Sequence, residues 1–403
     1  MKKYLYLLCL LAAPLSAQTL KVYEGQLCQA FDAAWCGTMT YADGGRTLTV
    51  GRSVFDVSSI DSIIVDESPV EAATVSVVFS GGQAFVTVSG DKADSLSVTV
   101  SGAHVSVVAV PELQTEMTYV LSGSSDNGSF YMDGSFKSTV ELHNLSLNSA
   151  TGAAVTIDNG KRIRVVLPEG TVSTLSDCAG GTQKACFFVN GHPEFEGSGT
   201  LNLTGRSRHA FASDEYTFLK AKFGTLNILS AVSDGLHVGQ YFRMRGGTVN
   251  ISGTGGDGID VSKTKDEKDE MNGQLLIEGG RLVLTVASDD TKGLKCEDAA
   301  TVSGGVIEVE ATALGARGLA VGTDLLVNAA SETAPQIRMT VSGGRYTDPE
   351  SQKEKRARGI DVDGDFTFDG GDISISATGK GSQAVKVGGT YTYLSGTIDC
   401  TVQ

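Results

Sequence analysis

Apolar and polar positions follow one repeated pattern in the C-terminal half of the chain. Each copy has a small residue, an apolar residue, any residue and a second apolar residue, and in most copies a glycine pair about 11 residues later opens an alternating strand. Self-similarity at a fixed period is typical of stacked repeats. Six clear copies begin at Gly235, Gly258, Gly293, Gly318, Gly359 and Ala384, and three weaker ones begin at Ala154, Ala185 and Ala210.

The spacing of the copies indicates how they stack. Polar inserts interrupt the pattern at 263–270, 328–336 and 348–356, and without them the period is 23 to 25 residues. A unit of this size cannot bury an apolar face alone, whereas stacked units pair each strand with its equivalents and form inward ladders of Leu, Ile and Val. We therefore predict an all-β fold, a parallel β-helix (solenoid) with the inserts as loops at its rim. Right-handedness follows from the general preference for right-handed crossovers between parallel strands.

The N-terminal third of the chain is less regular. Alternating runs at 74–79, 84–89 and 96–100 are plausible strands. They form either a small β domain or the first coils, and the sequence leaves both open. The predicted organisation is a signal peptide at 1–17, an irregular β-rich N-terminal region at 18–115 and the β-helix domain at 116–403.

The first residues have the pattern of an export signal. Lys2 and Lys3 precede an apolar run at 4–14, which closes on the small-residue segment 15–17. No later run approaches the roughly 18 consecutive apolar residues of a membrane span. The sequence predicts an exported protein without a membrane span, which resides in the periplasm, at the cell surface or outside the cell.

Composition and charge narrow the class of ligand. Acidic residues number 47 against 32 basic ones, for a formal net charge of −15. This balance argues against nucleic acid, whose binding requires clustered Lys and Arg.

In an oxidising compartment, the closely spaced pairs Cys28 with Cys36 and Cys178 with Cys186 are candidate disulfides.

Several segments, taken in order, resemble a known family. They include Ser233-Asp234-Gly235-Leu236-His237 and Gly256-Asp257-Gly258-Ile259-Asp260, preceded by landmarks at 119–123, 140–147, 152–161 and 197–203. Over about residues 118–400 the chain resembles the bacterial carbohydrate-binding β-helix proteins related to family-nine pectate lyases. The resemblance implies a right-handed parallel β-helix that binds plant-type or acidic polysaccharides, with calcium held by aspartates at the coil turns and no demonstrated lyase chemistry. The segments 178–188 and 211–223 depart from the family's glycine-rich pattern, which leaves the preferred glycan open.

Aspartates recur at equivalent points of successive copies. Stacking places such equivalents roughly 5 Å apart, close enough to share a cation. Calcium accepts six to eight oxygen ligands in loose geometry, and unpaired stacked carboxylates would repel one another. The alternative is that aspartates beside glycine are simply favoured in turns. The candidate calcium ligands are Asp234, Asp257, Asp260, Asp289 and Asp290.

A calcium-dependent, pectate-lyase-like β-elimination is the alternative function. The resemblance places a lysine base after the calcium-binding coils, where Lys295 and, in competition with it, Lys292 lie. Calcium would acidify the uronate C5 proton, and a lysine with a lowered pKa would remove it. Gly256 stands where those enzymes carry a further acid, which weakens the site. Without catalysis, Lys295 is a solvated residue or an ion-pair partner of Asp290.

Binding without catalysis requires an extended polar face with aromatic platforms. The leading prediction is a secreted polysaccharide-binding protein, assisted by calcium, that recognises plant-type or acidic glycans; a purely structural cell-surface protein is a further alternative. The five histidines are scattered and predict no metal set, although His209 and His237 fall near equivalent coil positions. The sequence leaves the oligomeric state open. The candidate carbohydrate-binding residues are His237, Lys295, Tyr241, Tyr391 and Tyr393.

Overall fold

The computed structural model describes residues 18–33, 36–331 and 333–403. The predicted signal peptide at 1–17 lies outside these residues. The described chain is all-β: it contains a 23-stranded sheet, a 12-stranded sheet and two small sheets of three and two strands. Its only helical elements are the short 3-10 turns η1 (Asp43–Gly45), η2 (Val57–Ser59) and η3 (Ala93–Ser95). Within the described ranges no helix has the length and apolar character needed to cross a bilayer.

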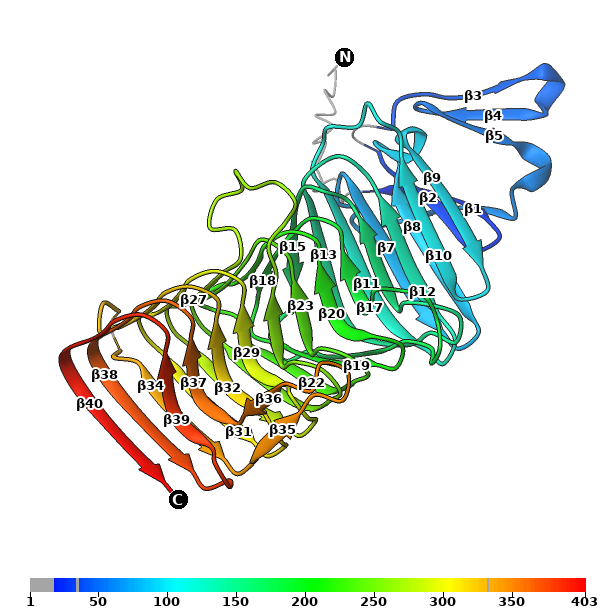
Figure 1. The fold of residues 1–403 in the computed structure, drawn as a ribbon. Coiled ribbons are helices and arrows are strands. Elements are labelled where there is room, and N and C mark those ends of the chain that lie inside the picture. Colours follow the sequence, from blue (N-terminus) through cyan, green and yellow to red (C-terminus); the bar gives the residue numbers. More distant parts are fainter. Residues whose placement is uncertain (1–17, 34–35, 332) are drawn as a thin grey trace, which may run out of the picture.

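The predicted repeats form neighbouring strands of the 12-stranded sheet (Figure 1). All nine copies supply consecutive strands, from β14 to β39, and all of these pair in parallel. The pattern therefore predicted both the strands and their order. The strands of this sheet are β9 (Leu96–Ser101), β10 (His104–Ala109), β12 (Ser129–Asp133), β14 (Val155–Asp158), β17 (Ala185–Val189), β20 (His209–Ser213), β23 (Leu236–Val238), β26 (Ile259–Val261), β29 (Lys292–Cys296), β32 (Arg317–Val321), β37 (Arg358–Val362) and β39 (Gln383–Val387).

The 23-stranded sheet contains two parallel lines of strands. A strand in either line pairs with the strand three elements later, so three strands and their turns make one coil. The first line contains β16 (Val172–Ser176), β19 (Thr200–Gly205), β22 (Thr225–Ala231), β25 (Thr248–Thr254), β28 (Arg281–Val286), β31 (Val306–Ala311) and β34 (Gln336–Val341). The second contains β15 (Arg162–Val166), β18 (His192–Glu196), β21 (Thr217–Leu219), β24 (Tyr241–Met244), β27 (Gln274–Ile277), β30 (Ala300–Val302) and β33 (Leu325–Asn328). The longer strands β11 (Met117–Ser125), β13 (Ser138–Asn148), β38 (Phe366–Ala377) and β40 (Tyr391–Val402) extend along both lines.

The core follows the axis along which the coils stack. Alternate residues of each strand point inward, as the pleat of a strand requires. One continuous row of unexposed side chains runs through the 12-stranded sheet, since the register places each member opposite the next. This row consists of Leu236, Ile259, Leu294, Leu319 and Ile360.

An asparagine ladder runs outside the core along the first line. The Asn227 side-chain amide donates to Asn202 Oδ1 at 2.8 Å, and Asn250 donates to Asn227 Oδ1 at 2.8 Å.

Replacing Asn227 with alanine removes both hydrogen bonds, and we expect the free energy of unfolding to fall by about 1 to 2 kcal/mol. Urea unfolding followed by circular dichroism measures this. The control is Leu229→Ala, an exposed position on the same strand, which should change stability by no more than about 0.5 kcal/mol; equal effects would contradict a role for the ladder.

The N-terminal region contributes strands to both sheets. β7 (Thr74–Ser80) pairs in parallel with β11, and β10 pairs in parallel with β12, whereas residues 83–89 pair antiparallel with β7, and β9 pairs antiparallel with β10. Before β7, a smaller apolar core gathers Val22, Phe31, Leu48, Val50 and Phe55. The remaining strands are β1 (Thr19–Glu24), β2 (Leu27–Asp32), β3 (Met39–Ala42), β4 (Thr47–Val50), β5 (Ser53–Asp56), β6 (Ser62–Asp66) and β8 (Gln83–Ser89).

Two local predictions need correction. The insert at 348–356 is not only a loop, because β35 (Arg345–Thr347) and β36 (Glu354–Arg356) pair as an antiparallel hairpin in which Arg345 and Glu354 form an ion pair. The predicted disulfides are absent among the described cysteines, all of which are free. In each candidate pair one partner is buried inside a strand while the other is only half-buried: Cys28 with Cys36, and Cys186 with Cys178.

Candidate functional site

Two rows of charged residues follow the outer side of the 12-stranded sheet, and we call them together the charged face. The first row lies just before, or at the start of, the strands, and the second lies at their outward centres. Because the strands are parallel and in register, residues of successive copies lie one above another. The first row is His209, Asp234, Asp257, Lys292, Arg317, Arg358 and Gln383; the second is His237, Asp260, Lys295, Ala320, Asp361 and Lys386.

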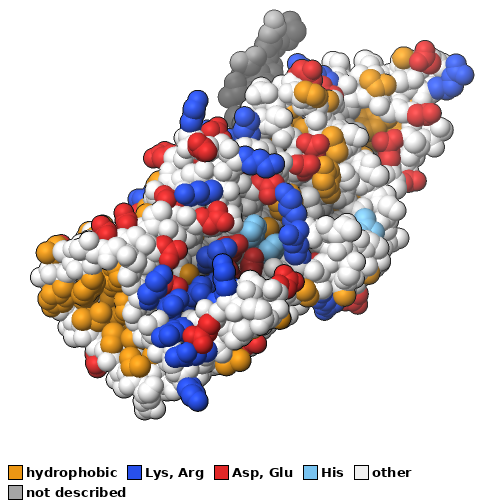
Figure 2. Space-filling model, viewed as in Figure 1, with side chains coloured by type: hydrophobic (Ala, Val, Ile, Leu, Met, Phe, Trp, Pro, Cys, Tyr) orange, Lys and Arg blue, Asp and Glu red, His pale blue; other side chains and the backbone are white. Residues whose placement is uncertain are grey.

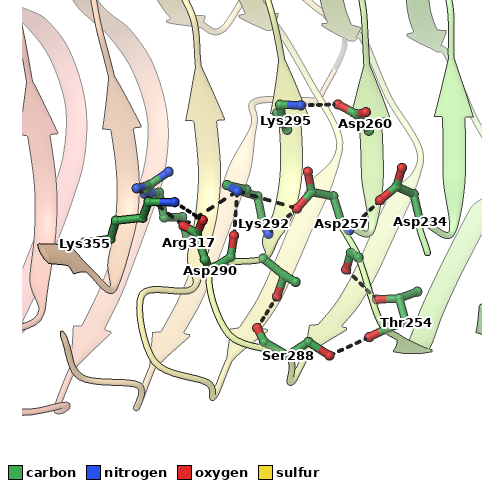
Figure 3. Close-up of polar contacts among 12 residues, drawn as sticks. Asp234, Thr254, Asp257, Asp260, Ser288, Asp290, Lys292, Lys295, Arg317 and Lys355 are labelled. Carbon is green, nitrogen blue, oxygen red and sulfur yellow. Dashed lines mark hydrogen bonds and ion pairs between the residues drawn. The ribbon is translucent and has the colours of Figure 1, made fainter. Parts of the chain in front are cut away.

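Backbone hydrogen bonds tie the first row together. The Asp257 N–H donates to Asp234 Oδ1 at 2.8 Å, and the Lys292 N–H donates to Asp257 Oδ1 at 2.8 Å (Figure 3). Burial raises the pKa of Asp257 to about 6, since the nearby Lys292 offsets only part of that effect. Each carboxylate is thus held in place by the coil that follows it.

The N-terminal end of the charged face combines histidines with carboxylates. His209 Nδ1 lies 3.2 Å from Asp234 Oδ2, and His237 Nδ1 lies 3.4 Å from the same oxygen and 3.0 Å from Asp260 Oδ2. The two imidazole rings stack with centroids 4.6 Å apart. The carboxylates of Asp234 and Asp260 beside it raise the pKa of His237 to about 9. The sequence predicted no metal set among the histidines, whereas stacking of the coils brings His209 and His237 to one carboxylate.

The C-terminal end of the charged face is rich in cations. Figure 2 shows Lys and Arg side chains gathered there, next to the histidines. A pocket of about 300 Å³ opens between them, lined by Lys292, Lys295, Arg317 and Asp361 among others. The cations that belong to this end are Lys292, Lys295, Arg317, Lys355, Arg358 and Lys386.

Asp361 organises the arginines of this end. Its carboxylate lies 2.8 Å from Arg358 Nη1, 3.1 Å from Arg317 Nε and 3.3 Å from Lys386 Nζ. Asp361 is buried and both arginines are mostly buried, whereas Lys386 and Lys295 keep about a third of their side chains exposed. The arginines are therefore fixed, and the two lysines can reach a ligand.

The five aspartates predicted to bind calcium do not converge on one point. Only His209, Asp234 and His237 bring three potential metal-ligand atoms within 4.8 Å of one another in the part of the chain that the structure describes. Asp257 faces Lys292, and Asp290 pairs with Lys355 from the hairpin β35–β36. Asp289 accepts a hydrogen bond from the Leu314 N–H at 3.1 Å.

These contacts bear on the choice of metal. Calcium requires six to eight oxygen ligands, but most of the predicted carboxylates already face protein cations, and two of the three clustered ligand atoms are nitrogens. The donor set does not fit the predicted calcium site, and we derive no chemical step from calcium.

The two lysines predicted as a base occupy different positions. Lys295 Nζ lies 2.9 Å from Asp260 Oδ1, so its partner is Asp260 rather than Asp290, which instead lies 3.8 Å from Lys292 Nζ. Burial disfavours the charged form of Lys295, but the hydrogen bond and the negative charge of Asp260 outweigh it, so the pKa of Lys295 lies above its ordinary value. A general base must be neutral at the working pH, and this pairing favours the charged lysine.

The predicted aromatic platforms lie outside the charged face. Tyr241 stacks on Tyr216 with ring centroids 4.7 Å apart, and Tyr216 stacks in turn on His192 at 4.7 Å, which makes a ladder along the second line of strands. Tyr391 and Tyr393 follow Phe366 and Phe368 in register, so they continue inward rows in the final described strand. They are exposed there as uncovered core positions.

The fold and the charged face define a class of repetitive all-β protein with long parallel sheets and an extended charged surface built from repeated positions. The chain belongs to the family of carbohydrate-binding domain-containing proteins, which matches residues 101–402. A carbohydrate-related function is therefore supported. Among solved structures, a polysaccharide lyase-like protein from C. thermocellum, determined as a gadolinium derivative, is similar at 18% identity over 66% of this chain and 96% of that chain, with a TM-score of 0.48. No curated protein sequence matches the chain.

Proposed function

We propose that the chain binds an acidic polysaccharide at the cationic end of the charged face. The observation that carries this proposal is the gathering of six Lys and Arg side chains at one end of this face, three of which line the pocket, in a chain of net charge −15. A neutral glycan has no need of such a cluster. Membership of a carbohydrate-binding family supports a glycan, rather than another polyanion, as the ligand.

The arrangement suits a repeating anion. Lys295 on β29 and Lys386 on β39 stand in one row three coils apart, at about 4.8 Å per coil, with Ala320 and Asp361 between them. Two cations placed in this way can bind separate carboxylates of one uronate chain through charge-assisted hydrogen bonds. Arg317 and Arg358, which Asp361 holds in place, add positive potential to the pocket without moving.

We also propose that the coils form a right-handed β-helix and that the protein is exported. The general handedness of parallel crossovers supports the first, and the charged and apolar pattern of residues 1–17 supports the second. Calcium assistance, lyase activity and a purely structural role stay predictions. Adding a chelator to the binding experiment tests the first, and ultraviolet absorbance of an unsaturated product from polygalacturonate tests the second.

Replacing Lys295 and Lys386 together with methionine should weaken binding of polygalacturonate by about 10- to 100-fold, because each charge-assisted hydrogen bond contributes on the order of 1 kcal/mol. Methionine keeps the length of the side chain and removes its charge. Isothermal titration calorimetry at low ionic strength measures the affinity, with neutral galactan as comparison ligand.

The control for this pair is Lys137→Met, an exposed lysine before β13 and away from the charged face. This variant should bind as the wild type does. Equal affinity of the double variant and the wild type, or equal binding of the neutral glycan, would overturn the proposal; loss of binding on chelation alone would instead favour calcium assistance.

A further inference from the structure

We infer that His209, Asp234 and His237 form a three-ligand binding site for a divalent transition-metal ion such as zinc. The site lies at the N-terminal end of the charged face, next to the pocket proposed for the glycan but built from different residues. It does not depend on the proposed function.

The donor types point to this class of metal. Two imidazole nitrogens and one carboxylate oxygen lie within 4.8 Å of one another, and imidazole with carboxylate is a usual ligand set of zinc. Calcium prefers oxygen ligands alone. The donor set therefore selects a transition metal over the calcium that the sequence predicted.

The spacing of the ligand atoms fits a tetrahedral centre. Ligands about 2.1 Å from a tetrahedral ion lie roughly 3.4 Å from one another. Asp234 Oδ2 lies 3.2 Å from His209 Nδ1 and 3.4 Å from His237 Nδ1. Asp260 Oδ2 lies 3.0 Å from His237 Nδ1 but outside this group of three, so the fourth position is left to a water molecule. The two imidazole rings are stacked with 20° between their planes, so one ring must turn for both Nδ1 atoms to face one ion.

The surroundings hold the ligands and favour positive charge. The Asp257 N–H occupies Asp234 Oδ1, which leaves Oδ2 directed at the two histidines, and such outer hydrogen bonds orient metal ligands. His237 Nδ1 is buried without a hydrogen-bond partner among the described residues, although two carboxylates lie beside it. A metal ion at this point would neutralise both carboxylates. The N–H of Asp234, at 3.3 Å from His209 Nδ1, would give up that long contact.

Burial gives the site a closed side and an open side. The side chains of His209 and Asp260 are more than nine-tenths buried, and that of Asp234 nearly so, whereas His237 is about a third exposed. An ion can therefore enter past His237.

Titration of chelator-treated protein with Zn²⁺, followed by calorimetry, tests the inference, and the absorption spectrum of bound Co²⁺ reports its geometry. We expect one ion per chain and a Co²⁺ spectrum typical of tetrahedral coordination. His209→Ala and His237→Ala should each weaken zinc binding by at least about 10- to 100-fold. His237 is partly exposed, so its variant tests the site even if loss of the buried His209 disturbs folding, which circular dichroism checks.

The matched control is His143→Ala, an exposed histidine paired with Glu141 elsewhere on the molecule, which should leave zinc affinity unchanged. The Lys295 and Lys386 double variant should keep its zinc affinity to within a few-fold, so that failure of glycan binding and failure of metal binding are distinguishable. Absence of zinc binding, retention of binding in both histidine variants, or Ca²⁺ binding as tight as that of Zn²⁺ would overturn the inference.

Discussion

Replacing Phe195 with alanine is expected to lower the free energy of unfolding by about 3 to 5 kcal/mol, the usual cost of removing a phenylalanine from a packed core. Phe195 is completely buried on β18 and touches three other phenylalanine rings. Its ring centroid lies 6.4 Å from that of Phe187, 5.4 Å from Phe211 and 5.8 Å from Phe223, in edge-to-face geometry. The cavity would remain because the strands around it are held by parallel neighbours on both sides.

Urea unfolding of the purified protein, followed by circular dichroism, measures this change. The matched control is Phe85→Ala on β8, where nearly half of the ring is exposed, and the expected change there is no more than about 0.5 to 1 kcal/mol. If the two variants lost equal stability, the aromatic cluster would not be a main source of cohesion between the coils.

Replacing Asp361 with asparagine should have two opposite effects. It leaves the largely buried Arg358 without its counter-ion and leaves Arg317 with only the 3.9 Å contact to Asp290, and we expect the free energy of unfolding to fall by about 3 kcal/mol, as for other buried pairs that lose one partner. It also removes a carboxylate that competes with an acidic ligand for the same cations, so affinity for polygalacturonate should rise by about 3- to 10-fold, since a hydrogen bond to a charged group contributes on the order of 1 kcal/mol.

Asp363→Asn is the matched control, because Asp363 also pairs with Lys386 but is about two-thirds exposed. It should leave stability nearly unchanged. Unfolding and calorimetric binding measured on the same preparations separate the two effects. If a folded Asp361→Asn protein bound the glycan more weakly, the prediction would be contradicted. The main effect of Asp361 would then be to hold the arginines in position, not to compete with the ligand for them.

Much of the fold could be predicted from the sequence because the fold is periodic. Gly235, Gly258 and Gly293 mark equivalent points of successive copies, and a parallel sheet places such points in register. The hairpin at 345–356 could not be predicted in the same way, because it pairs within its own insert and has no equivalent in other coils.

The site was predicted less well because its chemistry depends on pairs of coils. Asp260 and Lys295 occupy the same position of adjacent copies, so their contact follows from the register, yet the sequence suggested Asp290 as the partner. His209 directly precedes the copy that begins at Ala210, just as Asp234 directly precedes the copy that begins at Gly235. Comparison of this position across all copies would have predicted that His209 and Asp234 lie next to each other. The contact between Lys355 and Asp290 joins an insert to a turn, and no repeated position reveals it.

The charged face changes character between Asp257 and Lys292, from carboxylates and imidazoles on one side to ammonium and guanidinium groups on the other. In the proposed function, a polyanion laid along the coils would contact the cations from β29 to β39 and would be repelled by the carboxylates before β29. Since each coil contributes one position to either row, exchanging one residue would move that boundary by about 4.8 Å. The number of cationic coils would therefore set the length of polyanion that this face can hold.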